Sequence, residues 1–179
     1  VTSKEGKVFA FPDEGVCFRC DPDGSNLEVV ARGLRNPQEL AFDNYGNLFT
    51  GDNDCDHGDR ERLVHIVEGG DSGWRIGYQF SEQNPAGAWN AEKLWHTRWQ
   101  GQAAYLLPPL AHNDNGPSGF AFYPGIGLPE EFKDHFFLCH IKGQASVSGI
   151  KTFSLNPNGA TFEMVNDRIL AWNILPTDV

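Results

Sequence analysis

Short runs in which apolar and polar residues alternate recur along the whole chain. Five of them are KVFAF, VCFRC, ELAF, RLVHIV and HFFLCHI. Stretches rich in Gly, Pro, Asn and Asp separate these runs, among them DPDGS, DNYGN and NPNGA. Alternation with a period of two buries one face of a strand, and the turn signals return about every 8–12 residues. The pattern therefore predicts an all-β fold, which fits a sandwich, a barrel or a propeller.

One segment carries helix signals instead. NAEKLWHTRW begins at Asn90, a good capping residue, and places Leu94 and Trp95 on one apolar side. It lies within Ser81–Asn115, a long stretch that interrupts the strand pattern. We expect one short helical insertion there, between strands.

Two sequence units occur twice, and this repetition helps to distinguish among a sandwich, a barrel and a propeller. FRCDPDGSNLEVV, which begins at Phe18, returns as TFSLNPNGATFEMV around Phe153. NPQELAF, which ends at Phe42, returns as GPSGFAF, which ends at Phe122. Strand–turn–strand units that recur at long spacing predict propeller blades of about 40–50 residues. Residues 1–179 would then form a partial β-propeller domain of two and a half to three four-stranded antiparallel blades.

A propeller protects its blade edges by closing a ring, so we expect this chain to be a fragment of a longer protein. The absence of an initiator Met and of a visible signal peptide agrees with that expectation. No run of about 18 apolar residues predicts a membrane span. The net charge of −10 argues against nucleic acid and against an anionic membrane surface as partners.

The most acidic stretch is GDNDCDHGDRER, which begins at Gly51. Its acidic residues are Asp52, Asp54, Asp56, Asp59 and Glu61. They resemble an EF-hand loop, but the Gly comes one residue late, the last Glu two early, and the flanks are strands. Calcium takes six to eight oxygen ligands, which alternating carboxylates can supply. The first interpretation of this loop is therefore a calcium site.

Two other interpretations of the loop stay open. Acids packed this closely repel one another unless a cation or a neighbouring base offsets the charge, and Arg60 and Arg62 follow directly. The stretch could thus be a solvated loop held by local Arg pairs. The third interpretation is chemistry at Cys55 or His57.

The segment Gly33–Tyr78 resembles the soluble quinoprotein glucose/sorbosone dehydrogenases. The resemblance is carried by Arg35-Asn36-Pro37-Gln38, by Glu61 and by GDSGW, and more loosely by GPSGFAFYPG and FFLCHIKG. It is nearest to the large planctomycete-type relatives that are described as membrane-bound dehydrogenases or haem-binding proteins. The resemblance implies a six-bladed propeller that binds calcium and pyrroloquinoline quinone (PQQ).

The resemblance also implies roles for particular residues. Arg35 and Asn36 would face the central cavity and contact quinone and substrate, and Lys142 would pair with a quinone carboxylate. The main-chain carbonyls of Asp54 and Cys55 would hold the calcium of the cofactor. The Glu61 side chain and the Ser72 carbonyl would hold a second, structural calcium. The combined metal set is Asp52, Asp54, Cys55, Asp56, Asp59, Glu61 and Ser72.

The sequence departs from the family pattern at three places. The family has Gly-Pro where this chain has Asp54-Cys55, and paired Arg residues at the positions of Leu175 and Thr177. The catalytic His base of the family belongs to an earlier blade that this sequence does not contain, so no catalytic residue is assigned.

The implied activity is hydride transfer from a sugar or alcohol to the quinone. The alternative is a non-catalytic, calcium-stabilised propeller that binds carbohydrate or a partner protein, with Trp89, Trp95 and Trp99 as a sugar-binding surface. The relatives also suggest an extracytoplasmic location, where calcium is plentiful, and a cytochrome or a fused haem domain as partner.

Overall fold

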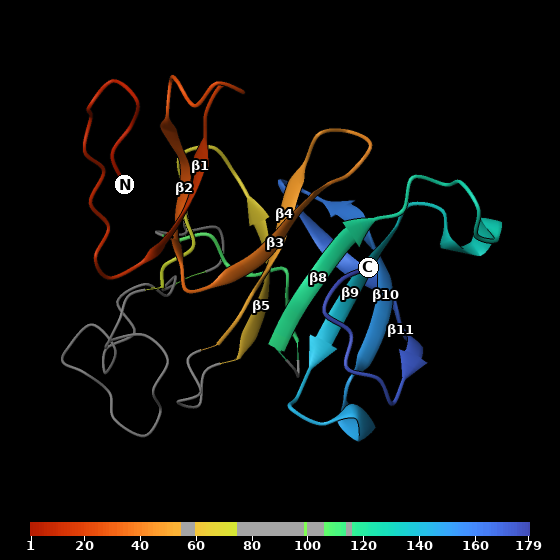
Figure 1. The fold of residues 1–179 in the computed structure, drawn as a ribbon. Coiled ribbons are helices and arrows are strands. Elements are labelled where there is room, and N and C mark those ends of the chain that lie inside the picture. Colours follow the sequence, from red (N-terminus) through yellow and green to blue (C-terminus); the bar gives the residue numbers. More distant parts are fainter. Residues whose placement is uncertain (55–59, 75–98, 100–105, 114–115) are drawn as a thin grey trace. The chain divides into compact units, whose positions relative to one another are not determined.

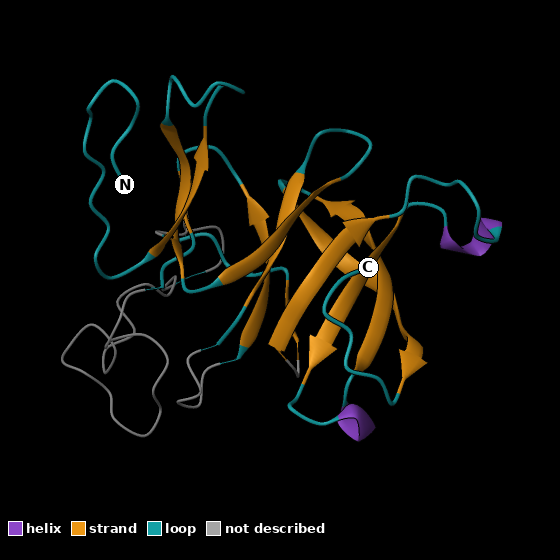
Figure 2. Cartoon of the chain, viewed as in Figure 1, coloured by secondary structure: helices purple, strands orange, loops and turns teal. Residues whose placement is uncertain are grey.

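The structure, a computed structural model, describes residues 1–54, 60–74, 99, 106–113 and 116–179. These residues form two compact units. Unit 1 takes in the described parts of Val1–Arg35 and Ile66–Pro108, and unit 2 those of Asn36–Asp54, Arg60–His65 and Pro109–Val179. Nearly all regular structure is strand, as Figure 2 shows. The predicted all-β class is therefore confirmed.

Unit 2 contains two four-stranded sheets (Figure 1). The first has the order β3 (Pro37–Phe42), β4 (Leu48–Asp52), β5 (Glu61–Ile66), β7 (Ala111–Asn113). The second has the order β8 (Gly116–Phe122), β9 (His135–Ile141), β10 (Gly149–Asn158), β11 (Thr161–Trp172). Two short 3₁₀ helices, η1 (Glu130–Phe132) and η2 (Ala145–Val147), lie in the connections of the second sheet. Both sheets have four antiparallel strands that follow one another in chain order, which is the arrangement predicted for propeller blades.

Unit 1 contains a smaller sheet of another kind. Its described strands are β1 (Gly15–Arg19), β2 (Glu28–Leu34) and β6 (Gly70–Asp71). β1 and β2 are antiparallel, but β2 and β6 are parallel, which differs from the predicted blade pattern. The cause is tertiary: Arg32 forms an ion pair with Asp71 at 3.0 Å, and Trp74 N donates to Gly33 O at 2.8 Å. A Cβ on Gly33 would overlap Asp71 Oδ1, so only Gly permits this approach.

The two repeated sequences form equivalent structures. FRCDPDGSNLEVV forms the β1–β2 hairpin and TFSLNPNGATFEMV the β10–β11 hairpin. Gly24 and Gly159, which align in the repeat, both have positive φ, at 84° and 63°. NPQELAF and GPSGFAF form β3 and β8, which each begin a sheet. The repeat is therefore a repeat of local backbone geometry, as predicted.

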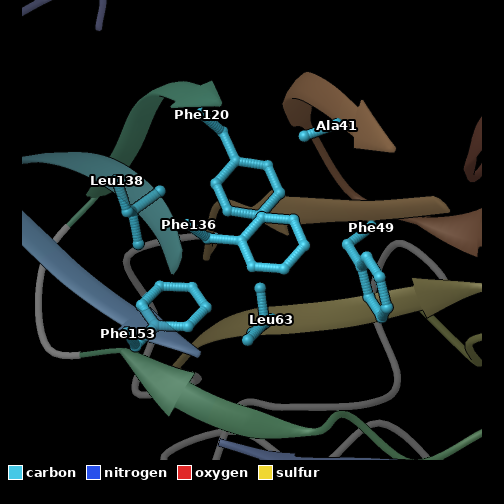
Figure 3. Close-up of a cluster of buried hydrophobic side chains, with 7 residues drawn as sticks. All are labelled: Ala41, Phe49, Leu63, Phe120, Phe136, Leu138 and Phe153. Atoms are coloured by element: carbon cyan, nitrogen blue, oxygen red, sulfur yellow. The ribbon is translucent and has the colours of Figure 1, made fainter. Parts of the chain in front are cut away.

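A layer of apolar side chains fills the space between the two sheets of unit 2 (Figure 3). Its members are Ala41, Phe49, Leu63, Phe120, Phe136, Leu138 and Phe153. Phe136 lies at the centre, stacked on Phe120 at 5.2 Å and on Phe153 at 5.9 Å between ring centroids. It also meets the edge of Phe49 from the other sheet at 5.3 Å. These contacts join the two sheets through aromatic rings.

Parts of the predicted insertion and of the acidic loop lie outside the described residues. Of the expected helix from Asn90 to Trp99, only Trp99 is described, and its side chain is exposed. Within the described residues, no helix is long and apolar enough to cross a membrane.

Phe136→Ala should destabilise the fold strongly. The ring is 1% exposed and contacts aromatic rings from both sheets, so its removal should lower the free energy of unfolding by about 3–5 kcal/mol. Phe42→Ala is the matched control, because Phe42 is 60% exposed. Urea denaturation measures the free energy of unfolding of both variants. Equal losses in the two variants would contradict this account of the core.

His65→Phe should flatten the dependence of stability on pH. The His65 ring lies between Phe49 and Phe162, at 5.1 Å from each, and burial lowers its pKa. The unfolded chain, with an ordinary pKa of about 6.5, binds a proton more readily, so acid destabilises the native state below that pH. The loss of unfolding free energy between about pH 7 and pH 5 should therefore be smaller in the variant, by urea denaturation. An unchanged loss would show that His65 does not carry this effect.

Candidate functional site

One end of the strands in unit 2 brings together residues that are far apart in the sequence. Because β3 and β4 are antiparallel, the start of β3 lies beside the end of β4, with Pro37 opposite Asp52. In the second sheet, the start of β8 lies beside the end of β9, with Gly116 opposite Ile141. We call this end the site edge; its residues are Asn36, Asn53, Gly116 and Lys142.

Asn53 connects the two sheets at the site edge. Its backbone N donates to Asn36 O at 3.3 Å. A Cβ on Gly116 would lie 3.3 Å from Asn53 Oδ1 and 3.2 Å from Ile141 O. Lys142 follows Ile141 directly. Two residues that the resemblance assigns to the cofactor, Asn36 and Lys142, therefore belong to one edge of one unit.

A buried ion pair holds the backbone at this edge. Asp52 is 1% exposed and Arg62 is 4% exposed. Arg62 Nη2 donates to Asp52 Oδ2, and the backbone N of Asn36 donates to Asp52 Oδ1 at 2.7 Å. One carboxylate thus connects the residue before β3, the end of β4 and the start of β5. The Asn36 backbone is fixed while its side chain stays exposed.

A second carboxylate joins β3 to β8. Glu39 Oε2 accepts a hydrogen bond from the backbone N of Phe120, and Glu39 O accepts one from Thr50 Oγ1. Near the edge, a Cβ on Gly51 would come within 2.6 Å of Pro117 Cβ. Gly51 is thus required for the close approach of β4 to β8.

Lys142 presents its ammonium group at this edge. Its backbone N donates to Ser148 Oγ at 2.9 Å, and Ser148 Oγ donates to Gln144 O at 2.6 Å, which fixes the turn. The Lys142 side chain is exposed and forms no ion pair with the described residues. It is therefore available to an anionic group, and the exposed Asn36 amide supplies donors and an acceptor at the same edge.

The metal set predicted from the acidic loop is only partly described. Asp52 accepts hydrogen bonds from Arg62 and Asn36, and Asp54 is half-buried. Cys55, Asp56 and Asp59 lie outside the described residues. Among the residues that are described, no group of three or more His, Cys, Asp or Glu side chains is arranged to hold a metal ion. Calcium binding by the loop stays a prediction.

The remaining predicted residues fall on both units. Glu61 is buried at the start of β5 in unit 2, and its main-chain O lies 3.3 Å from His112 Nδ1. Arg35 and Ser72 belong to unit 1. Arg35 is half-buried there, and the backbone N of Ser72 donates to Arg32 O at 2.9 Å. The structure therefore groups Asn36 with Lys142, and leaves the second calcium a prediction.

The C-terminal segment lies along β8. Ser118 Oγ donates to Pro176 O at 3.2 Å, and a Cβ on Gly119 would lie 2.5 Å from Asp178 Cα. Leu175 and Thr177, where the family has its Arg pair, thus lie close to the start of β8 but carry no charge. Cys139 on β9 is fully buried, and burial raises the pKa of its thiol to about 11, so it remains protonated.

Two residues of this region, Asn53 and Glu39, were not predicted. Asn53 lies within the acidic loop, where the carboxylates dominate the pattern. Glu39 occupies what looks like an ordinary polar position of an alternating strand. The repeat offered a signal for Glu39, because NPQELAF has Glu at the position where GPSGFAF has Gly.

Arg62→Met should destabilise the protein by about 3–5 kcal/mol, because it leaves the buried Asp52 carboxylate without this counter-ion. Adding Asp52→Asn, which keeps an acceptor for Asn36 N, should restore part of the loss. A double-mutant cycle by urea denaturation measures the coupling. Strictly additive losses would mean that the pair contributes no coupling.

No protein-family model matches this sequence, and no curated protein matches it. Solved structures do match. A proposed oxidoreductase (glucose dehydrogenase) of Thermus thermophilus has a TM-score of 0.50 and 20% identity, and the match covers 80% of this chain and 35% of that one. The PQQ-bound aldose sugar dehydrogenase of Streptomyces coelicolor has a TM-score of 0.51 and 18% identity, covering 88% and 39%.

The soluble aldose sugar dehydrogenase of Escherichia coli, in its apo form, gives a TM-score of 0.51 and 18% identity, covering 78% of this chain and 37% of its own. This chain therefore spans between 35% and 39% of the length of these structures. At this level of identity the likeness is one of fold. The chain has the fold of part of a β-propeller.

Proposed function

We propose that this chain is part of a quinoprotein-type dehydrogenase that binds PQQ and calcium at the site edge and oxidises a sugar or an alcohol. The observation that carries the proposal is that Asn36 and Lys142, both exposed, belong to the same strand end. The likeness in fold to sugar dehydrogenases, one of them PQQ-bound, supports the same interpretation.

The residues at this edge fit an anionic, planar cofactor. PQQ carries three carboxylates, and Lys142 offers an ammonium group that no described acid neutralises. Arg35 would add a second cation, as the resemblance implies. Leu175 and Thr177 supply no charge where the family has Arg, so Lys142 should carry an unusually large share of the binding energy.

The quinone, when bound, supplies the hydride acceptor. The residues of this chain bind and orient. Asp52 accepts the Asn36 N–H and so fixes the Asn36 backbone, which would place the side-chain amide at the site edge to direct a substrate hydroxyl. Carbonyls at Asp54 and Cys55 would hold calcium beside the cofactor. The base that takes the hydroxyl proton is expected from an earlier blade.

A second candidate function is recognition without catalysis. Trp99 is 65% exposed, as expected if Trp89, Trp95 and Trp99 form an aromatic surface for carbohydrate. In that case calcium would stabilise the propeller and PQQ would not bind. An extracytoplasmic location fits both candidates, and a cytochrome or haem partner stays a prediction.

A PQQ titration of the full-length protein, with and without calcium, tests the proposal. We expect saturable, calcium-dependent binding. Lys142→Ala should weaken it roughly 10- to 150-fold, the range of a hydrogen bond to a charged group. Lys142→Arg, which keeps the charge, should weaken it less.

Equal affinity in the wild type and Lys142→Ala would refute the role of Lys142. Absence of PQQ binding, together with a melting temperature that calcium raises, would favour recognition without catalysis. Saturable binding would justify a screen of sugars with an electron-accepting dye.

A further inference from the structure

The β10–β11 hairpin closes through a tight, exposed turn. Asn158 ends β10 opposite Thr161, which begins β11, so Gly159 and Ala160 alone connect the two strands. Gly159 has a φ of 63°, and a Gly with positive φ at the first of two turn positions is typical of a type II′ turn. Every residue from 156 to 161 is exposed. The turn therefore presents an Asn-Gly dipeptide to water.

An Asn-Gly dipeptide contains both partners of a known reaction. The backbone nitrogen of Gly159, once deprotonated, can attack the side-chain carbonyl carbon of Asn158. The new N–Cγ bond closes a succinimide ring, while the Cγ–Nδ2 bond breaks and ammonia leaves. Water then opens the ring at either carbonyl and gives aspartate or isoaspartate, with no change of oxidation state. The reaction requires a free Gly N–H, room for the Asn backbone to rotate, and access for water.

The β10–β11 turn meets these requirements. No described residue accepts a hydrogen bond from the Gly159 N–H. A Cβ added to Gly159 would meet no atom within 4 Å, so the turn is open on that side. Among the described residues, Asn158 is held only by its pairing with Thr161, the last pair of the hairpin. The exposed end of a hairpin opens at a small cost in free energy, because no further pair has to separate.

The equivalent turn of the repeated sequence is protected. Asp23 and Gly24 occupy the corresponding positions there. Gly24 N donates to Asp21 O at 2.8 Å, so this N–H is not free. The Asp23 carboxylate accepts a hydrogen bond from Lys4 Nζ at 2.8 Å, which lowers the pKa of Asp23 to about 2. An ionised carboxylate resists attack by a nucleophile. The repeat therefore contains one protected turn and one open turn.

The sequence holds a second Asn-Gly dipeptide, Asn115-Gly116, whose Gly lies in a strand. Gly116 belongs to β8 and lies opposite Ile141 of β9. A Cβ on Gly116 would come within 3.2 Å of Ile141 O, so the neighbouring strand leaves this backbone little room. Asn115 itself lies outside the described residues. Gly116 would have to leave its strand before it could react, so this dipeptide is an internal control for the open turn.

We propose that Asn158 is a site of spontaneous modification, at which the native protein loses ammonia and forms aspartate or isoaspartate. Either product adds one negative charge to a chain whose net charge is −10. Isoaspartate also lengthens the main chain by one carbon at the pair that precedes Phe162, whose ring packs against Phe49 at 5.2 Å. The change therefore acts on charge and on the hairpin. It does not depend on PQQ or calcium at the site edge.

Peptide mapping of the full-length protein by mass spectrometry, after incubation at physiological temperature, tests the site. Native protein is compared with protein unfolded in guanidinium chloride. The native rate of conversion at Asn158 should lie within about tenfold of the unfolded rate, because the turn opens at low cost. Since the attacking nitrogen must lose a proton, conversion should be several-fold faster at about pH 8 than at about pH 6.

The internal control and a variant make the test specific. Asn115 and Asn158 should convert at similar rates in the unfolded chain, whereas in the native protein Asn115 should convert at least about tenfold more slowly than Asn158. Asn158→Gln keeps the amide but would need a larger ring. This variant should therefore lower the isoaspartate content of the aged native protein, measured with an isoaspartyl methyltransferase.

Faster conversion of Asn158 than of Asn115 in the native protein, together with the loss of isoaspartate in Asn158→Gln, would support the proposal. A native rate at Asn158 that falls more than about tenfold below the unfolded rate would overturn it, because the turn would then be closed. Native conversion that is faster at Asn115, or an isoaspartate content that Asn158→Gln leaves unchanged, would overturn it as well.

Discussion

The packing of phenylalanine rings between the two sheets of unit 2 is the constraint on which the rest of the structure depends. The described residues contain no helix long enough to cover a sheet, so each sheet can bury its apolar face only against another sheet. Phe120, Phe136 and Phe153 from one sheet and Phe49 from the other meet that need. The packing sets β3 beside β8, and their two ends then become the two places where polar side chains from distant parts of the sequence gather.

The sequence predicted those features of the fold that depend on local geometry. Alternation predicted strands, and the repeated Gly at positions 24 and 159 marked two equivalent hairpins because both need a positive φ. The parallel pairing of β2 with β6 was not predictable in this way. It depends on the ion pair between Arg32 and Asp71 and on the close approach of Gly33 to Asp71. These contacts join segments that lie about forty residues apart in the chain. Such contacts leave no period in the sequence.

The candidate site was predictable in part, for a related reason. The resemblance indicated Asn36 and Lys142, and the strand register places both at one edge. The acidic pattern indicated Asp52 as a metal ligand, yet Asp52 accepts hydrogen bonds from Arg62 and from the Asn36 backbone. The pairing with Arg62 agrees with the interpretation that the loop is held by Arg, except that the pair is buried rather than solvated. A sequence shows which carboxylates are close to a base, but burial decides whether the pair organises the backbone.

The two ends of the same sheets therefore offer opposite chemistry. At the site edge, an ammonium and an amide can donate to an anionic group. At the other end, the carboxylates of Asp43 and Asp134 accept hydrogen bonds from the turn that joins β3 to β4. The strands between them set the separation: β8 has 7 residues, which at about 3.3 Å per residue corresponds to roughly 20 Å. A ligand at one end cannot reach the other over that distance, and the Coulomb effect of one charge on the other end is largely screened at physiological ionic strength. Changes at the far end should therefore leave binding at the site edge unaffected unless the aromatic layer between the two ends is disturbed.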